Sequence, residues 1–289
     1  MSQTAEPAVT RAKEVLARHG LRARKGLGQH FLVDGRVLGR IVAAADLTPD
    51  DTVIEVGPGL GVLTQELVRR AGRVIAIEAD GAMVTALGDL AARSPNLTLV
   101  HADVMRVDPA SLLPAPGAGQ SAAYKVVANI PYYITSAVLR HFLEASPRPA
   151  AMVVMVQKEV GKTIVAGPGD LSLLAVSVQF YGRPSIVARV PARSFYPPPK
   201  VDSVILRVDV YDRPPVDVPG AGAFFDTVRA GFSAPRKQLR NSLAQGLGVG
   251  TGEAAGLLQR AGIDPTRRAE TLSLEEWGRL CREREGLET

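Results

Sequence analysis

Residues 52–68 read TVIEVGPGLGVLTQELV, and this stretch decides the fold. A short β-branched run passes into three closely spaced glycines, Gly57, Gly59 and Gly61, and a helical pattern follows directly. Glycine lets the backbone approach a ligand closely, and the N-terminus of the following helix favours polar or anionic groups. The stretch therefore predicts a strand, a ligand-binding turn and a helix, which together open a βα unit.

The spacing of these glycines narrows the class of ligand. Val62 stands where a dinucleotide-binding fingerprint has its third glycine, so the pattern argues against NAD and its pyrophosphate. A glycine loop alone is also compatible with a turn that is merely tight.

Short apolar runs alternate with helical patterns from about residue 50 to residue 210. Several runs are apolar at nearly every position, which is typical of strands covered on both faces. The pattern predicts an α/β fold, a doubly wound and mostly parallel sheet. The last two candidate strands flank PARSFYPPPKVD and are expected to pair antiparallel at one edge. The candidate strands are 52–56, 73–78, 97–101, 124–129, 151–156, 173–180, 185–190 and 203–208.

Composition divides the chain into four segments. A basic arm and first helix are predicted for 1–40, and the α/β domain for 41–211. Prolines and glycines indicate a linker over 212–222. Residues 223–289 are rich in helix formers and predict a small helical domain.

Bulk composition excludes several classes of protein. The 289 residues contain one cysteine, Cys281, and four histidines, so neither an internal disulfide nor a metal site is predicted. No run of about 18 apolar residues is present, and the first residues do not resemble a signal peptide. A cytoplasmic protein is expected.

Positive charge is concentrated near the N-terminus. The net charge is +5, and residues 1–40 alone hold eight Lys or Arg against three acids. Such an arm predicts contact with a polyanion, with Arg22, Arg24 and Lys25 as candidate phosphate ligands. A solvated tail with an ordinary charge fluctuation is the alternative.

Acidic residues end the second and third predicted strands. Glu78 can accept both hydrogen bonds of a ribose diol, and Asp103 can accept one from the exocyclic amine of adenine. Open α/β sheets bind ligands at the carboxyl ends of their strands, where both residues and the glycine loop would meet. A nucleoside ligand is predicted, although Glu78 could instead cap a helix and Asp103 could stabilise a turn.

The fourth predicted strand ends in Asn129-Ile130-Pro131-Tyr132 on the same edge. The side-chain oxygen of Asn129 and the carbonyl of Ile130 can accept both hydrogens of one amino group, while Pro131 holds the turn. Gripping both hydrogens localises the lone pair of a purine or cytosine amine and makes it nucleophilic. Tyr132 offers a face for stacking the base. The alternative is a structural Asn-Pro turn with core tyrosines.

Taken together, these motifs resemble the KsgA-type rRNA adenine N6-dimethyltransferases. The resemblance covers most of the chain, although His30 and Tyr133 stand where many members have asparagine. Its motifs are KGLGQHFL (25–32), EVGPGLG (55–61), NIPY (129–132), QKE (157–159), FYPPPKVDS (195–203) and RKQLRNSL (236–243).

The resemblance implies a Rossmann-like S-adenosylmethionine-dependent methyltransferase domain with a seven-stranded sheet, followed by a helical domain. It also implies a monomer that dimethylates two adjacent adenosines in the 3′-terminal hairpin loop of 16S rRNA, in an immature small subunit. The target adenine would be held by residues 129–132 and stacked by Tyr132 and Phe195. Cofactor contacts are implied for His30, Leu32, Gly57, Gly59, Glu78, Asp103 and Asn129, and RNA contacts for Arg236, Lys237 and Arg240.

Two other functions stay open. A macrolide-resistance methyltransferase, which modifies 23S rRNA, has the same glycine loop and Asn-Ile-Pro-Tyr motif. The PPPKVDS and RKQLRNSL stretches resemble the small-subunit enzymes more closely. A non-catalytic RNA-binding assembly factor is the second alternative, and the intact motif at residues 129–132 argues against it.

Overall fold

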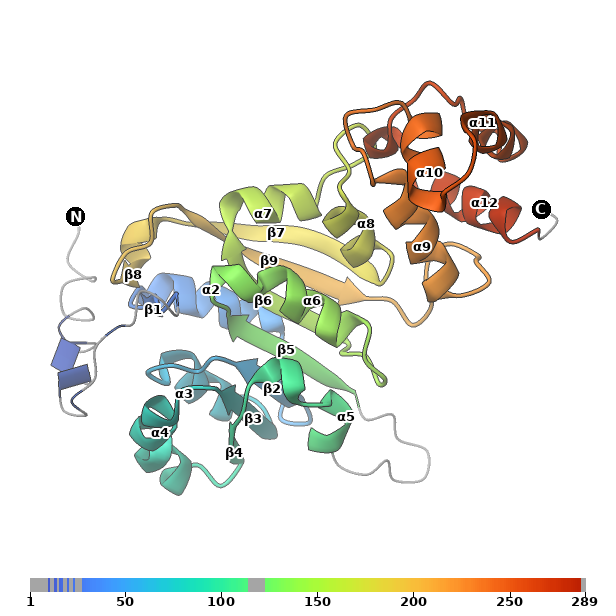
Figure 1. Ribbon diagram of the computed structural model, residues 1–289. Helices are drawn as coiled ribbons and strands as arrows, with labels where there is room; N and C mark the ends of the chain where they lie inside the picture. The colour runs from blue at the N-terminus through green and yellow to red at the C-terminus, as the bar shows by residue number, and fades with distance from the viewer. Residues whose placement is uncertain are drawn as a thin grey trace, which may run out of the picture. The chain divides into compact units, whose positions relative to one another are not determined.

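The computed structural model describes residues 10, 13–14, 16–17, 20, 23, 28–113 and 123–286, and it is built on a seven-stranded sheet (Figure 1). The strand order is β4-β3-β2-β5-β6-β9-β7. Neighbours from β4 to β6 pair in parallel and β9 pairs antiparallel with β6, which confirms the predicted mostly parallel sheet. The strands are β2 (Thr52–Val56), β3 (Arg73–Glu78), β4 (Leu97–His101), β5 (Tyr124–Asn129), β6 (Ala151–Gln157), β7 (Gly182–Val190) and β9 (Ser203–Val210).

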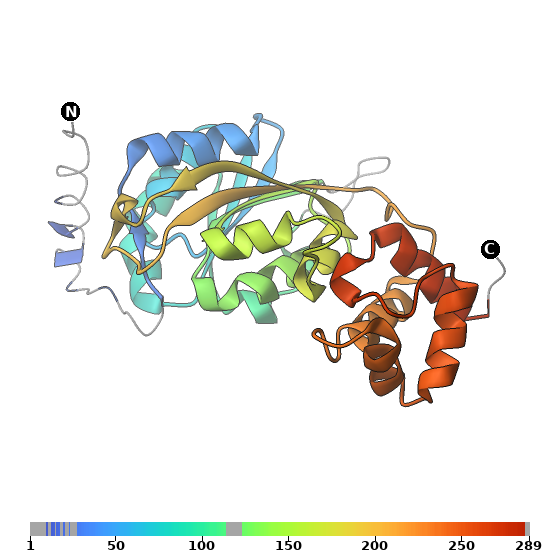
Figure 2. The same ribbon diagram turned by 90° about the horizontal axis from the view of Figure 1, so that it is seen from above.

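Helices cover both faces of this sheet, as the apolar strands require. Figure 2 shows α2 and α6 on opposite faces. Central strands such as β6 are buried along nearly their whole length, because helices pack against both of their sides. The helices that follow or precede the parallel strands are α2 (Gly35–Ala45), α3 (Val62–Val68), α4 (Gly81–Arg93), α5 (Pro109–Leu112), α6 (Thr135–Leu143) and α7 (Lys158–Ile164).

The core beneath α2 shows how local sequence sets this packing. Asp34 caps α2, since its carboxylate accepts hydrogen bonds from Arg36 N and Val37 N. Apolar residues at helical spacing then bring Ile41 against the sheet, where it joins a buried cluster with Val53. Burying such side chains contributes about 1.5–3 kcal/mol each to the stability of the folded protein. This gain outweighs the weak preferences of single residues for helix or strand.

A second, two-stranded sheet joins the N-terminal segment to the loop after β7. Strands β1 (Phe31–Leu32) and β8 (Phe195–Tyr196) pair antiparallel, with Leu32 opposite Phe195. Val33 N donates to Ser194 O at 2.9 Å, which extends the pairing by one bond. Two-residue strands carry no periodic signal, so this sheet was not predicted. It holds the segment before α2 beside the carboxyl ends of the main strands.

The predicted strand at 173–180 is wrong. Leu173–Gln179 forms a helix, α8, whose first turn is capped by Ser172 Oγ accepting from Ala175 N at 3.1 Å. Its run of buried residues follows from packing against α9 (Ala221–Gly231) and from the stacking of Phe180 on Phe224 at 4.5 Å. A short, mostly apolar run suits a buried helix as well as a buried strand, and here tertiary packing decides.

The chain divides into two compact units. One comprises Met1–Gly161 with Ser185–Val210, and the other Lys162–Pro184 with Tyr211–Thr289. This division differs from the predicted boundaries at 41–211, 212–222 and 223–289, because α8 packs on α9 rather than joining the sheet. The predicted first segment, 1–40, lies partly outside the described residues. The second unit also contains α10 (Leu239–Leu247), α11 (Thr251–Arg260) and α12 (Leu274–Arg284).

Close packing holds the helices of the second unit together. Trp277 on α12 is fully buried and stacks on Phe232 with ring centroids 5.6 Å apart. Gly231 lies under this indole, where an added Cβ would come within 2.3 Å of the ring. Gly246 similarly lies against the backbone of Ala230. A Cβ added to Gly246 would lie 2.4 Å from the Cα of Ala230. Small residues thus let α9, α10 and α12 approach one another.

Neither a membrane span nor a metal cluster is found in the described ranges. No helix within them has both the length and the apolar character needed to cross a bilayer. Within the same ranges, no three His, Cys, Asp or Glu side chains gather in a group that could hold a metal ion.

Candidate active site

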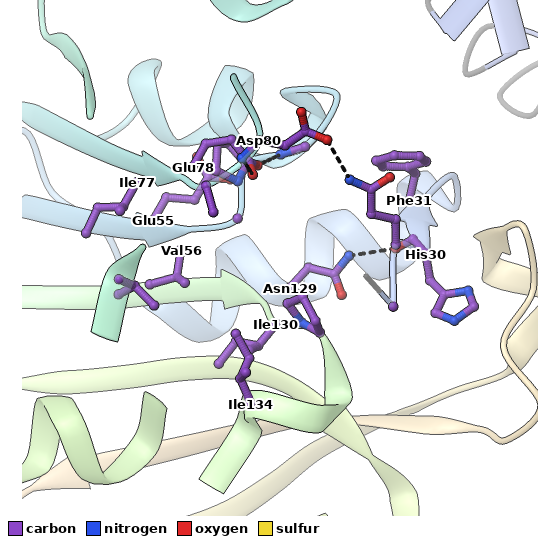
Figure 3. A pocket seen from close by; sticks show the side chains of 18 of the residues that line it. His30, Phe31, Glu55, Val56, Ile77, Glu78, Asp80, Asn129, Ile130 and Ile134 are labelled. Carbon is purple, nitrogen blue, oxygen red and sulfur yellow. Dashed lines mark hydrogen bonds between the residues drawn. The ribbon is translucent and has the colours of Figure 1, made fainter. Parts of the chain in front are cut away.

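A cavity of about 570 Å³ opens at the carboxyl ends of β2, β3 and β5 (Figure 3). This is the edge where parallel α/β sheets bind their ligands, and the volume suits a small organic molecule. Except for Phe195 and the proposed RNA contacts, every predicted site residue lines it. Its lining consists of residues 28–32, 55–60, 62–63, 77–81, 102–105 and 129–134.

The glycine loop forms one wall with backbone rather than side chains. Gly57 and Gly59 have φ values of +68° and +55°, in a backbone region that residues other than glycine rarely adopt. A Cβ on Gly59 would lie 3.2 Å from the ring of Phe31, so the first glycines allow both the turn and a close approach. The predicted role of the loop fits this geometry.

Glu78 is held in place at the end of β3. Its Oε1 accepts from Asp80 N at 2.9 Å and its Oε2 from Gly59 N at 3.3 Å. Burial raises the pKa of this carboxyl, and the two N–H donors partly oppose the rise. Each oxygen retains a further lone pair, so an oriented carboxylate can still accept from two hydroxyls of a ligand.

Asp103 lies at the cavity and also stabilises a turn. Its Oδ1 accepts from Met105 N at 3.0 Å and caps the short 3-10 helix Val104–Arg106. The turn-stabilising alternative is therefore real, but it occupies only one carboxylate oxygen. Asp103 is exposed and lines the cavity, so the other oxygen is available to a donor on a ligand.

Asn129 has its amide orientation set by the N-terminal segment. Nδ2 donates to the carbonyl oxygen of His30 at 3.0 Å (Figure 3). A carbonyl can only accept, so the amide nitrogen lies on that side and Oδ1 on the other. Oδ1 makes no hydrogen bond to any residue that the structure describes. An acceptor without a partner is thus held at the cavity, beside the buried Ile130.

Tyr132 is fixed by its hydroxyl. Tyr132 Oη and Ser203 Oγ, on β9, lie 2.6 Å apart, and burial raises the tyrosine pKa above its ordinary value. The His30 ring stacks near it, with centroids 6.0 Å apart and planes at 25°. His30 Nδ1 donates to Pro197 O at 2.7 Å. The tyrosine ring therefore stands in one orientation at the edge of the cavity.

Comparison with known sequences identifies the family. Residues 20–283 match the profile of the family described as ribosomal RNA adenine dimethylase. The chain belongs to this family. A protein of Dehalococcoides mccartyi named ribosomal RNA small subunit methyltransferase A is 55% identical over 97% of this chain and 95% of its own length. A protein of the same name from Moorella thermoacetica is 45% identical over 98% of this chain and 99% of its own length.

Two solved structures share the fold of this dimethylase. The crystal structure of 23S rRNA methyltransferase ErmE superposes with a TM-score of 0.68 and 29% identity, covering 88% of this chain and 98% of that one. A dimethyladenosine transferase from Plasmodium falciparum has a TM-score of 0.72, 23% identity and coverage of 89% and 99%. The second likeness concerns the fold alone. The predicted family and the Rossmann-like, S-adenosylmethionine-dependent methyltransferase fold are confirmed.

Phe195 does not lie where it was predicted to lie in the dimethylase site. It is 2% exposed and packs in the core cluster with Leu32, outside the cavity lining. Antiparallel pairing of β8 with β1 points this ring into the core, so a base cannot stack on it in the present conformation. The stacking role assigned to Phe195 therefore finds no support here, whereas Tyr132 lines the cavity.

Two features of the cavity went unnoticed in the sequence. Glu55, on β2, is 1% exposed, and its Oε2 has no hydrogen-bond partner among the described residues. Burial and the nearby charge of Glu78 raise its pKa to about 8. Gln29 Nε2 donates to Asp80 Oδ2 at 3.4 Å, which links the N-terminal segment to the start of α4. A charged residue inside an apolar strand was the available signal for Glu55.

The predicted RNA contacts fall into two groups. Arg22, Arg24 and Lys25 lie outside the described residues. Arg236, Lys237 and Arg240 are all exposed in the second unit, at and before the start of α10. Their exposure is compatible with phosphate binding, and their role stays a prediction.

Proposed function

We propose that this protein transfers methyl groups from S-adenosylmethionine to N6 of two adjacent adenosines in the 3′-terminal hairpin loop of 16S rRNA. The product is N6,N6-dimethyladenosine at both positions, made in the cytoplasm during assembly of the small subunit. The observation that carries the proposal is the oriented amide of Asn129, whose Oδ1 stands at the cavity with no hydrogen-bond partner among the described residues.

The residues at the cavity fit the cofactor. Gly57 and Gly59 offer bare backbone for close approach, and Glu78 is an oriented acceptor for the ribose hydroxyls. Asp103 keeps one oxygen for the adenine amine. Glu55, whose Oε2 has no hydrogen-bond partner among the described residues, offers the cofactor a further polar group at the cavity. When bound, S-adenosylmethionine supplies an electrophilic methyl group on a positively charged sulfur.

Our proposed mechanism rests on two acceptors. Asn129 Oδ1 and the carbonyl of Ile130 take the two N6 hydrogens of the target adenine, which localises the nitrogen lone pair. Holding the amine in line with the methyl group contributes much of the rate, since alignment of reactants is worth up to about 7–11 kcal/mol. No strong base is needed, because the methylated nitrogen is positively charged and releases its proton readily.

Tyr132 would hold the base itself. With its hydroxyl bound to Ser203, the ring is preorganised for stacking against an adenine taken out of its loop. Base stacking on an aromatic ring contributes about 1–3 kcal/mol, enough to offset part of the cost of unstacking. Unpaired loop bases are the ones that proteins read most readily in RNA.

The 23S rRNA alternative shares this mechanism and differs only in substrate. Identity to the relatives named for the small subunit reaches 55%, against 29% for the 23S enzyme of known structure. The stretch RKQLRNSL at 236–243 also lies in the second unit, outside the residues that form the cavity. On the higher identity and on this stretch, which resembles the small-subunit enzymes more closely, we favour the small subunit.

Mass spectrometry tests the proposal directly. Small and large ribosomal subunits lacking dimethyladenosine would be incubated with the protein and isotope-labelled S-adenosylmethionine, and the rRNA then digested and mapped. We expect label on two neighbouring adenosines near the 3′ end of 16S rRNA. Label confined to 23S rRNA would favour the alternative, and binding without any label would indicate a non-catalytic assembly factor.

A further inference from the structure

Tyr133 is an exposed aromatic side chain at the cavity. It is 69% exposed, well above the 45% of Val201, the next most exposed large hydrophobic residue in the described ranges. Singly exposed apolar residues are common, but this one lines the cavity and follows Tyr132 directly. An aromatic face left in solvent at the edge of a binding site is available to a ligand.

The two neighbouring tyrosines are held very differently. Tyr132 is anchored through Ser203, whereas the hydroxyl of Tyr133 makes no hydrogen bond to any described residue. The ring edge of Tyr133 rests beside Gly28, where an added Cβ would lie 3.5 Å from its Cδ1. Gly28 has φ of +63°, so the backbone conformation there favours a residue without a side chain. The ring is therefore positioned on one side and open on the other.

Both tyrosines belong to one 3-10 helix, Tyr132–Ile134. Successive residues of such a helix point about 120° apart, because three residues complete a turn. Their Cα atoms are nevertheless only about 3.8 Å apart. Two bases, one against each ring, can therefore come from adjacent nucleotides of the same strand.

We propose that Tyr133 forms a second base-binding position, on which the unpaired base next to the target adenine stacks. Drawing an adenine into the cavity breaks its stacking with the neighbouring base and exposes that neighbour's face. The exposed ring of Tyr133 replaces the lost stacking. Because stacking on an aromatic ring tolerates any base, this position recognises an unpaired neighbour rather than a particular sequence. The inference rests on the proposed function, since it requires an RNA substrate.

Substitution of Tyr133 tests the proposal on the full-length protein. With methyl-deficient small subunits as substrate, Tyr133→Ala should raise KM for the particle about 5- to 150-fold. Tyr133→Phe should stay near the wild-type KM, because stacking needs the ring and not the hydroxyl. The Kd for S-adenosylmethionine should change little in either variant. Val187→Ala is the matched control, since Val187 is 44% exposed on β7 and lies outside the cavity lining.

A binding experiment separates stacking from a merely structural role. Affinity would be measured for an RNA hairpin and for the same hairpin with an abasic nucleotide beside the target adenosine. We expect the abasic change to weaken binding by the wild-type protein and to have little effect on Tyr133→Ala. An equal loss in both proteins, or an unchanged KM for Tyr133→Ala, would overturn the second base-binding position.

The outcomes also distinguish this inference from the proposed function. Methylation of 16S rRNA by wild type and Tyr133→Ala alike would refute only the role of Tyr133. A wild-type protein that methylates no rRNA would refute the proposed function, and the hairpin experiment would still decide whether Tyr133 stacks on a base.

Discussion

Glycines serve opposite purposes in the two units of this dimethylase. In the first unit, Gly57 and Gly59 take positive φ values and expose backbone to a cavity. In the second unit, Gly231 and Gly246 lie in helices, where an added Cβ would clash with Trp277 and Ala230. The first pair makes room for a ligand and the second makes room for neighbouring helices. Substitutions should therefore affect methyl transfer in one unit and stability in the other.

Asn129→Ala should have the largest effect of all, mainly on activity. Removing the oriented Oδ1 takes away one of two acceptors for the amine, and the loss of one such polar group lowers kcat by about 10²–10³-fold. Because Asn129 is only partly buried, the free energy of unfolding should change by about 1 kcal/mol or less. Single-turnover methylation and urea unfolding measure the two effects. Near-normal turnover would contradict the amine-gripping mechanism.

Glu55 lines the cavity in the first unit, and its ionisation should make the stability of the protein depend on pH. Its pKa is raised to about 8 in the folded protein, from an ordinary value of 4.5. The folded state thus binds the proton more tightly, and the stabilisation present below pH 4.5 is lost as the pH rises towards 8. Between pH 5 and pH 8, unfolding free energy should fall by roughly 3 kcal/mol from this group.

Glu55→Gln is the control for that pH dependence. A neutral amide of the same shape should remove the contribution of Glu55, so the variant should lose less stability than wild type between pH 5 and pH 8. Urea unfolding at several pH values measures the difference. Parallel pH profiles for the two proteins would mean that Glu55 stays ionised throughout the range.

Gly246→Ala should affect stability in the second unit. The new Cβ would lie 2.4 Å from Ala230 Cα, and backbone cannot yield as a flexible side chain can. Overpacking of this kind costs about 1–3 kcal/mol. We expect a lower midpoint in thermal unfolding and an unchanged Kd for S-adenosylmethionine below the transition. Gly252→Ala is the matched control, because an added Cβ there meets no atom of the described residues within 4 Å. Equal effects of both substitutions would argue against the clash.

Charge removal on the second unit should have the smallest effect per residue. If Arg236, Lys237 and Arg240 bind phosphates, their joint replacement by Gln should reduce the slope of log affinity against log salt by about 1 for each contact. The same triple replacement at Arg22, Arg24 and Lys25 gives the comparison with the N-terminal arm. Fluorescence anisotropy with rRNA fragments at several salt concentrations measures both. If the salt dependence of binding does not change for one of these triple variants, the three charges replaced in it do not contact phosphates.

Much of the site could be predicted from local sequence. The apolar runs predicted the bounds of β2, β3, β4 and β5 closely. The polar residues at or just after the ends of three of these strands, Glu78, Asp103 and Asn129, line one cavity. This succeeds because parallel strands joined by helices must bring their carboxyl ends to the same edge. The predicted strand at 173–180 is instead the helix α8, because a short and mostly apolar run shows no clear period that distinguishes a helix from a strand.

The sequence by itself determined which residues reach the edge of the sheet, because strand period and chain direction are local properties. Only the tertiary structure decided what those residues can do there. Asn129 is oriented by a carbonyl 99 positions away, and Phe195 is turned into the core by pairing with β1. Glu55 is buried on β2, and its Oε2 finds no hydrogen-bond partner in the part of the chain that the structure describes. Orientation, burial and pKa depend on contacts between distant segments, and no local pattern encodes them.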